Sequence, residues 1–280
     1  MGIAKKFFRK MDEMLSLISE GILARRKLSE LHNAIRPFAG YNIPESPFPY
    51  DPKLFLQATP QRYTENYKKY LEKGGLFQTD DIQKFISNSS GHFFDCSRFY
   101  FFNLVIDMLS SPMEIVGDIA ELGVDKGNTA SVLSLAAKRL GKTIYLLDTF
   151  EGFSQKDLVG VDSARDVAFN DTSLESVRGF VDGQHVRFIK GHFPESAQQL
   201  PDNLKFCLVH LDCDLYKPFS SALEFFWPRL VPGGFLIMHD YNSLHWDGVE
   251  QAVNEFFLKK PESIIPLPDM SGTVCVRKFK

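Results

Sequence analysis

The chain has 280 residues, a length that fits one large domain or one domain with a substantial extension. Hydrophobic residues make up 44% and charged residues 24% of it, the proportions of an ordinary globular protein. The formal net charge of −3 argues against a protein that binds nucleic acid through an overall positive charge. No apolar run approaches the roughly 18 residues that would span a membrane, so no transmembrane segment is expected.

The four cysteines are widely scattered and show no C-x-x-C spacing. This pattern is typical of a reducing compartment and gives no sign of a zinc site or a disulfide framework. The sequence therefore predicts a cytoplasmic protein.

Residues 1–110 are predicted to form a mostly helical, aromatic-rich N-terminal extension. Apolar residues recur at helical spacing over 11–35, behind a basic stretch at 1–10. This segment either packs on its own domain or on a partner subunit, giving a homo-oligomer, or contacts a membrane surface peripherally. A proline-rich connector is expected over 41–59, and a dense aromatic cluster lies near the end of the extension.

After residue 111 short apolar runs alternate with helical patterns. Strands are predicted at 115–122, 143–147, 186–190, 206–211, 235–238, 263–267 and 273–277. Helices are predicted at 128–140, 219–230 and 249–258. This alternation predicts an α/β domain over 111–280: a doubly wound, seven-stranded, mainly parallel sheet of Rossmann-like type.

The first predicted strand ends in a glycine turn that follows an acidic residue. Glu121, Gly123 and Gly127 have the spacing E-x-G-x-x-x-G, which is not the dinucleotide fingerprint G-x-G-x-x-G. The glycines allow a ligand to approach the backbone, and the acid suits a ligand with a cationic end, such as a sulfonium with an amino group. Asn128 and Thr129, at the start of the next helix, are candidate contacts to the same ligand.

The second predicted strand ends at Asp148, followed by Thr149 and Phe150. An acid roughly twenty residues beyond a glycine turn can accept hydrogen bonds from ribose hydroxyls. The alternative is that Asp148 is a turn or capping residue. With both elements in register, we favour a nucleoside-type cofactor at this end of the sheet.

Two later strands also end in charged residues. Asp212 and Asp214 follow one predicted strand, and His239 and Asp240 follow the next. Because the carboxyl ends of neighbouring parallel strands share one edge, these four candidate ligands or bases should converge. Each acid could instead cap a following helix, which applies above all to Asp214.

Together these motifs resemble the macrocin-type O-methyltransferases, which methylate sugar hydroxyls in antibiotic biosynthesis. The matching stretches are E-L-G-V at 121–124, D-T-F-E-G at 148–152, L-D-C-D-L-Y at 211–216, V-P-G-G-F at 231–235 and H-D-Y at 239–241. The resemblance covers roughly residues 118–257 and implies S-adenosylmethionine as the cofactor, with Asp212 near it.

The resemblance also implies a magnesium site and a catalytic base. By position it implies that Asp212 and Asp240 are metal ligands and that Asp214 is the general base. His239 stands where the family often has Asp, and imidazole is a poor ligand for Mg²⁺. His239 therefore either favours Mn²⁺ or a transition metal, lies outside the ligand shell, or marks a site without metal.

Two further histidines are candidates for function. His192 follows a predicted strand and is expected either to approach the adenine of the cofactor or to close the site, whereas His245 follows Asp240 and is an alternative base. His210 lies inside an apolar strand and is interpreted as a core histidine. The long stretch 157–174 interrupts the rhythm of strands and helices and is predicted to be a lid that orders when the cofactor binds.

The sequence thus favours a metal-dependent O-methyltransferase that acts on a sugar, glycan or polyketide-type small molecule. A metal ion on a hydroxyl oxygen acidifies it, and a nearby carboxylate can take the proton. Two alternatives remain: a metal-independent methyltransferase with another acceptor, and a non-catalytic scaffold of the same fold. A nicotinamide dehydrogenase is disfavoured by the missing fingerprint.

Overall fold

The computed structural model describes residues 96–110, 115–181, 183–243, 245–267, 269 and 272–280. The predictions for residues 1–95, which include the amphipathic helix at 11–35 and its partner or membrane contacts, lie outside the described residues. None of the described helices combines the length and the apolar character needed to cross a membrane.

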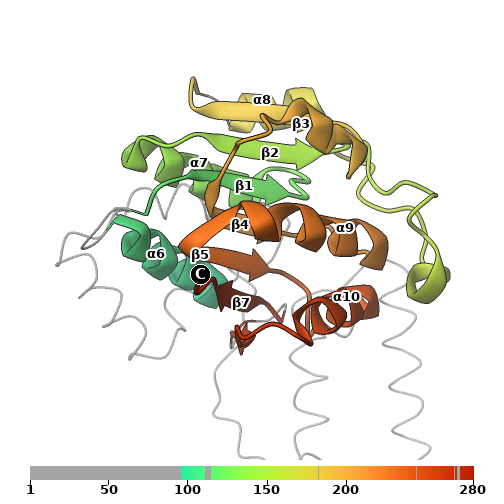
Figure 1. The fold of residues 1–280 in the computed structure, drawn as a ribbon. Coiled ribbons are helices and arrows are strands. Elements are labelled where there is room, and N and C mark those ends of the chain that lie inside the picture. The colour runs from blue at the N-terminus through green and yellow to red at the C-terminus, as the bar shows by residue number, and fades with distance from the viewer. Residues whose placement is uncertain (1–95, 111–114, 182, 244, 268, 270–271) are drawn as a thin grey trace, which may run out of the picture. The chain divides into compact units, whose positions relative to one another are not determined.

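One seven-stranded sheet organises the chain, in the order β3-β2-β1-β4-β5-β7-β6 (Figure 1). The strands are β1 (Asp118–Leu122), β2 (Ile144–Asp148), β3 (Val186–Lys190), β4 (Phe206–Leu211), β5 (Leu230–Met238), β6 (Ile265–Pro266) and β7 (Val274–Arg277). The first five are parallel, and β7 runs antiparallel to both of its neighbours. The predicted doubly wound, mainly parallel sheet is confirmed.

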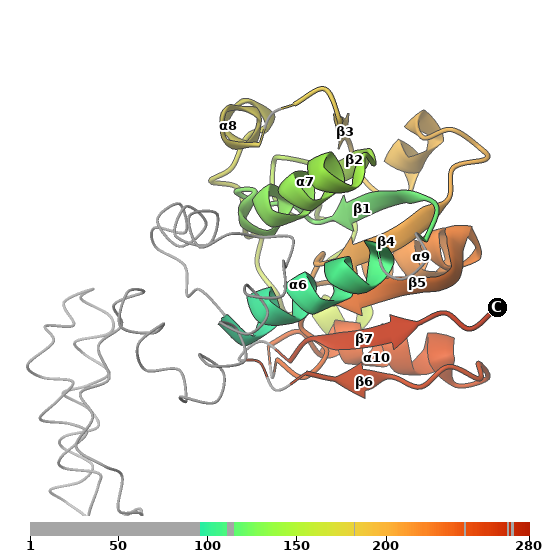
Figure 2. The same ribbon diagram turned by 90° about the vertical axis from the view of Figure 1, so that its left-hand side faces the viewer.

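Five described α-helices and three short 3₁₀ helices accompany the sheet. The α-helices are α6 (Cys96–Ser110), α7 (Asn128–Leu140), α8 (Leu174–Phe180), α9 (Tyr216–Phe226) and α10 (Asp247–Phe257). The 3₁₀ helices are η2 (Gly160–Asp162), η3 (Glu195–Gln199) and η4 (Trp227–Arg229). Figure 2 shows α6 and α7 in front of the strands.

The two faces of the sheet are buried by different elements. Val209 and Leu211 of β4 belong to the apolar core that includes residues of α9 and α10. His210, between them, must point to the opposite face because side chains alternate along a strand. There it meets the ring of Phe102 from α6, edge to face, with the centroids 5.1 Å apart.

Most predicted boundaries agree with the structure to within a few residues. β5 is the main exception, because it begins at Leu230 rather than at residue 235. Pro232 and the glycines after it indicate a turn, but the pairing of β4 with β5 shifts register between Phe206 and Leu208, and this irregularity takes up the extra residues. The helix α8 was not predicted.

The segment that follows β2 leaves the sheet before the chain returns to α8 and β3. It carries η2 beside α10, where Asp162 accepts a hydrogen bond from the amide of Tyr216 at the start of α9 (2.7 Å; Figure 1). Nearer its end, the Oγ1 of Thr172 donates to the carbonyl of Asp125 (2.5 Å). The segment, which we call the β2–α8 excursion (residues 149–173), is thereby fastened at two distant points.

Candidate active site

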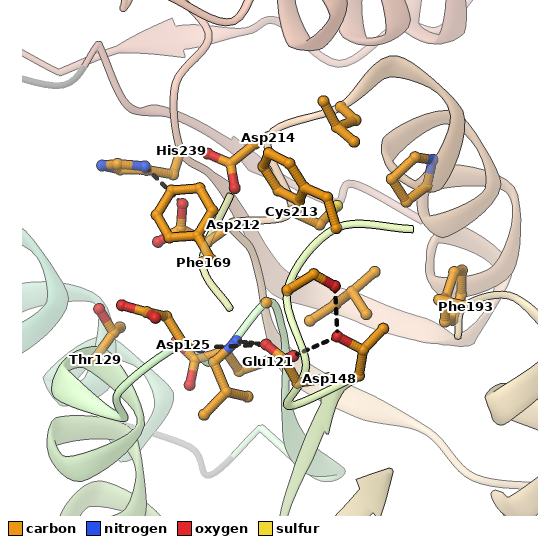
Figure 3. A pocket seen from close by; sticks show the side chains of 18 of the residues that line it. Glu121, Asp125, Thr129, Asp148, Phe169, Phe193, Asp212, Cys213, Asp214 and His239 are labelled. Atoms are coloured by element: carbon orange, nitrogen blue, oxygen red, sulfur yellow. Dashed lines mark hydrogen bonds and ion pairs between the residues drawn. The ribbon is translucent and has the colours of Figure 1, made fainter. Parts of the chain in front are cut away.

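A cavity of about 400 Å³ lies at the carboxyl ends of the strands around β1 and β4. β1 and β4 are neighbours, and the chain continues from β1 toward one edge of the sheet and from β4 toward the other. Open α/β sheets bind ligands at the point where the strand order reverses in this way. The cavity is lined by residues of α6 and α7, of the loops after β1, β3, β4 and β5, and of the β2–α8 excursion (Figure 3).

The turn after β1 depends on glycine. Gly123 has φ +87°, and a Cβ added there would lie 1.9 Å from the carbonyl oxygen of Asp212. The amide of Asp212 in turn donates to Leu122 (2.8 Å), so the loops after β1 and β4 are held in contact. The cavity is lined, as predicted, by Gly123, Asn128 and Thr129. Gly127 is not among the lining residues; it is the N-cap residue of α7.

Asp148 fastens the glycine turn to the end of β2. One carboxylate oxygen accepts the amides of Val124 (2.6 Å) and Asp125 (3.1 Å). The other accepts the amide of Phe150 (2.6 Å) and is 3.3 Å from the Thr149 hydroxyl. Asp148 and Thr149 line the cavity, and the ring of Phe150 is buried in the interior instead. The structure shows the Asp148 carboxylate in its alternative role, as the acceptor of backbone amides in the two turns. Its predicted contact with a ribose stays a prediction.

Glu121 and His210 form a buried pair beneath the cavity. The Nδ1 atom of His210 lies 3.0 Å from one carboxyl oxygen of Glu121, and both side chains are at most 1% exposed. Burial raises the pKa of Glu121 well above its usual value and lowers the pKa of His210 to about 3. The second carboxyl oxygen of Glu121 has no hydrogen-bond partner among the described residues, although Glu121 lines the cavity. A buried acceptor of this kind suits a cationic ligand group.

Asp212, His239 and Asp240 converge, as the sequence predicted. Ligand atoms of the three lie within 4.8 Å of one another. The Nδ1 atom of His239 is 2.6 Å from a carboxylate oxygen of each acid, and Figure 3 shows its contact with Asp212. Burial opposes a charge on His239, but the two carboxylates outweigh it and raise its pKa to about 9. The same contact keeps the pKa of Asp212 low despite its burial.

Asp214 lies in a tight turn beside these three residues. It has φ +59°, uncommon for a residue other than glycine, and its side chain lines the cavity. Burial and the carboxylates of Asp212 and Asp240 raise the pKa of Asp214 well above its usual value. Asp214 is not the capping residue of α9, because Leu215 occupies the N-cap position. The amide of Tyr216, the first residue of α9, donates to Asp162 instead. The capping alternative for Asp214 is therefore wrong.

The donor set of this cluster fits a divalent ion with mixed ligands. Two carboxylates and one imidazole can approach a common point, and the Nε2 atom of His239 is buried without a hydrogen-bond partner among the described residues. Mg²⁺ prefers oxygen ligands alone, whereas Mn²⁺ and later transition metals accept imidazole. The residues therefore fit Mn²⁺ better than Mg²⁺.

The remaining two predicted histidines differ in placement. His192 lines the cavity and bonds Asp157 of the β2–α8 excursion (2.6 Å) and Glu195 (2.8 Å). Partial burial opposes its charge, but these two carboxylates raise the pKa of His192 above the ordinary value. His245 is exposed and is not among the residues that line the cavity; Trp246 beside it is. The structure therefore does not bring His245 to the other candidates.

Several lining residues were not singled out from the sequence. Arg98, whose Nη1 atom is 3.6 Å from Asp212, comes from α6, within the stretch assigned to the N-terminal extension; Phe102 of the same helix belongs to the predicted aromatic cluster and also lines the cavity. Phe153, Phe169 and Trp246 form an aromatic group at the other side of the cavity. Trp246 lies in the loop that follows His239 and Asp240, which was the one available signal for it; nothing in the sequence marks Arg98.

The sheet order and the acidic, glycine-turn site at its centre define a Rossmann-like fold of the O-methyltransferase type. The solved structure of the O-methyltransferase NovP has this fold, with a TM-score of 0.58 and 20% identity over 66% of this chain and 80% of that one. The calicheamicin methyltransferase CalS11 is similar, with a TM-score of 0.51 and 19% identity over 81% and 89% of the two chains.

The chain belongs to the macrocin-O-methyltransferase (TylF) family, whose model matches residues 102–267. A tetracenomycin-C rhamnosyl 4'-O-methyltransferase of Streptomyces olivaceus is 32% identical over 51% of this chain and 58% of its own length. The mycinamicin III 3''-O-methyltransferase of Micromonospora griseorubida is 30% identical over 45% and 56%. The matches thus span less than two thirds of these relatives, and the family resemblance seen in the motifs is confirmed.

Proposed function

We propose that this chain is an S-adenosylmethionine-dependent O-methyltransferase that modifies a hydroxyl group of a sugar, glycan or polyketide-type small molecule. The observation that carries the proposal is the meeting of two kinds of acid in one cavity: Glu121 under the glycine turn, and Asp212, Asp214 and Asp240 beside it. A relative named as the 4'-O-methyltransferase of a rhamnosyl tetracenomycin supports the acceptor class.

The cofactor would be held by the loops after β1 and β2. The open carboxyl oxygen of Glu121 matches the amino group of the methionine part, and the Gly123 turn lets the ligand approach the backbone. Asp148 fixes that turn, and Asn128, Thr129, Thr149 and His192 line the cavity around it. The cofactor supplies the methyl group; the chain supplies its position and excludes water from the reacting atoms.

Asp214 is the proposed general base. An alcohol is a weak nucleophile because it holds its proton tightly at neutral pH. Asp214 lines the cavity, and the neighbouring carboxylates make its own affinity for a proton higher than that of an ordinary aspartate. A carboxylate with a raised pKa is a better proton acceptor, so Asp214 is suited to receive the hydroxyl proton as the oxygen attacks.

Asp212, His239 and Asp240 are the proposed ligands of a divalent cation, with Mn²⁺ favoured over Mg²⁺. When bound, the cation would acidify an acceptor hydroxyl and fix its orientation. Arg98 is near Asp212 and would help to hold that carboxylate in place. The scattered cysteines, without C-x-x-C spacing, fit a reducing, cytoplasmic setting for this reaction.

A metal-independent version of the same reaction is the second candidate, and one observation favours it. The Nδ1 atom of His239 already bonds both carboxylates, so a protonated imidazole stands between them where a metal cation would otherwise be needed. In this version Asp214 acts with the His239 imidazolium rather than with a metal ion.

Calorimetric titration separates these possibilities. We expect S-adenosylmethionine to bind the wild type, and Mn²⁺ to bind more tightly than Mg²⁺. Asp212→Asn should abolish metal binding, and Asp202→Asn, an exposed aspartate outside the cavity, serves as the matched control. Failure of S-adenosylmethionine to bind the wild type refutes the methyltransferase proposal. Cofactor binding and methyl transfer that persist in EDTA refute the metal-dependent version alone.

A further inference from the structure

Three aromatic side chains form one side of the cavity, and the proposed chemistry uses none of them. Phe153 and Phe169 belong to the β2–α8 excursion, and Trp246 precedes α10. Their ring centroids are 5.1 Å apart for Phe153 and Phe169, 5.6 Å for Phe153 and Trp246, and 6.3 Å for Phe169 and Trp246. We call these three residues the aromatic corner.

The aromatic corner shares its cavity with the proposed reacting groups. Asp214 and His239 line the same space as the three rings, and Figure 3 shows Phe169 projecting into it. Trp246 follows β5, on the opposite side of β4 from the glycine turn. The corner thus joins the loop after β2, which supplies Phe153 and Phe169, to the loop after β5, in the cavity that also holds the proposed reacting groups.

Phe169 is held in its place against a local conformational preference. It has φ +59°, which is unfavourable for a bulky residue and persists only where the surroundings impose it. The amide of Phe153 donates to the carbonyl of Ala168 (3.1 Å), and a Cβ added at Gly152 would lie 2.4 Å from that oxygen. Gly152 therefore permits the close approach that brings Phe153 and Phe169 together.

Trp246 is held in place by contacts with Arg165 of the β2–α8 excursion. The guanidinium carbon of Arg165 lies 5.0 Å from the centroid of the Trp246 ring system, a cation–π contact. Arg165 also donates a hydrogen bond to the backbone carbonyl of His245. These contacts join the excursion to the loop after β5.

The inclination of the rings indicates what they bind. The ring planes meet at 67°, 89° and 41°, so no two of them form the parallel walls that would clasp a flat aromatic ring. A pyranose ring is puckered, carries C–H groups on one face and directs its hydroxyl groups outward from its edge. Such a ring can rest its apolar face in the corner while its hydroxyls reach Asp214 and the metal-binding cluster.

We propose that Phe153, Phe169 and Trp246 bind the pyranose ring of the acceptor and so determine which class of hydroxyl is presented to Asp214. This proposal rests on the O-methyltransferase function proposed above. It predicts that the rings contribute to acceptor binding and leave cofactor binding unchanged.

The test measures the two ligands separately. S-adenosylhomocysteine is titrated first by calorimetry, and methyl α-L-rhamnopyranoside is then titrated into the saturated protein by saturation-transfer NMR. We expect the dissociation constant of the sugar to rise roughly fivefold or more in Phe169→Ala and in Trp246→Ala, with a smaller rise in Trp246→Phe. The affinity for S-adenosylhomocysteine should be unchanged in all three. Phe279→Ala, an exposed phenylalanine that does not line the cavity, is the matched control.

The outcomes are distinguishable. Sugar affinity that is equal in the wild type and both alanine variants, or no sugar binding to the wild type, overturns the proposal. Tighter binding of catechol than of the sugar, lost in the alanine variants, overturns the choice of a pyranose ring. A wild type that does not bind S-adenosylhomocysteine refutes the proposed function, and the aromatic corner is then judged by sugar binding to the unliganded protein alone.

Discussion

Replacing Glu121 with Gln separates charge from shape at the base of the cofactor site. The glutamine keeps the volume of the side chain and an oxygen that can face His210, 3.0 Å away in the wild type. With that oxygen facing His210, the amide nitrogen, a donor, replaces the carboxyl oxygen that has no hydrogen-bond partner among the described residues, so the substitution removes both a negative charge and an acceptor. Any loss of cofactor affinity therefore reports the loss of a charged acceptor rather than a change in side-chain volume.

The size of the loss follows from the kind of hydrogen bond removed. A hydrogen bond to a charged group contributes about 1.5–3 kcal/mol, so the dissociation constant of S-adenosylmethionine should rise about 10- to 150-fold in Glu121→Gln. The fold itself should not weaken. Burial raises the pKa of Glu121, so its ionised form is unfavourable in the folded state above the ordinary glutamate pKa, and glutamine lacks this penalty.

The assay is calorimetric titration in two buffers of different ionisation enthalpy, with thermal unfolding measured alongside. A bound cation lowers the raised pKa of Glu121, so cofactor binding should release a proton in the wild type and none from this site in Glu121→Gln. Glu224→Gln, an exposed glutamate on α9, is the control. A Glu121→Gln protein that binds S-adenosylmethionine within twofold of the wild type would refute the assignment of Glu121 to the cofactor.

Three further predictions test other parts of the site. His239→Asp makes the predicted metal site all-oxygen, so calorimetry should show the preference for Mn²⁺ over Mg²⁺ reduced by about tenfold; an unchanged preference contradicts the ligand role. Gly123→Ala should lower the free energy of unfolding by about 3 kcal/mol or more, because its Cβ would lie 1.9 Å from a carbonyl oxygen, whereas Gly141→Ala, with nothing within 4 Å, should lose only about 1 kcal/mol in denaturant titrations. His192 has a raised pKa, so the stability it adds is complete below about pH 6.5 and lost as the pH rises through the folded value; the melting temperatures of wild type and His192→Gln should therefore converge toward high pH.

Much of the fold was predictable because its signals are local. The helix over residues 128–140 begins at a glycine turn and ends before Gly141, and its bounds agree exactly with α7. The strands β3 and β4 are short apolar runs between turn residues, and they too lie where predicted. Since each signal is contained in a few neighbouring residues, no knowledge of the tertiary structure was needed.

The candidate site was predictable only where strand ends determine it. Parallel strands bring their carboxyl ends to one edge, which is enough to place Asp212 near His239 and Asp240. Arg98 reaches the cavity from a helix that precedes the first strand, and the 3.6 Å contact with Asp212 depends on how that helix packs. His245 and Trp246 are adjacent in sequence, and the direction of the loop alone decides that only the second lines the cavity.

Asp212 links the two halves of the site, and this link determines how variants must be read. Its carbonyl oxygen lies against the Gly123 turn, and its amide bonds Leu122, while its carboxylate bonds His239. A change of shape in the glycine turn will therefore displace the acid cluster as well as the cofactor. A change of charge at Glu121 leaves that backbone contact intact. We expect Gly123→Ala to lose both cofactor affinity and metal affinity, and Glu121→Gln to lose cofactor affinity alone. That pair of results would show that the contact between the loops after β1 and β4 aligns the methyl donor with the acceptor.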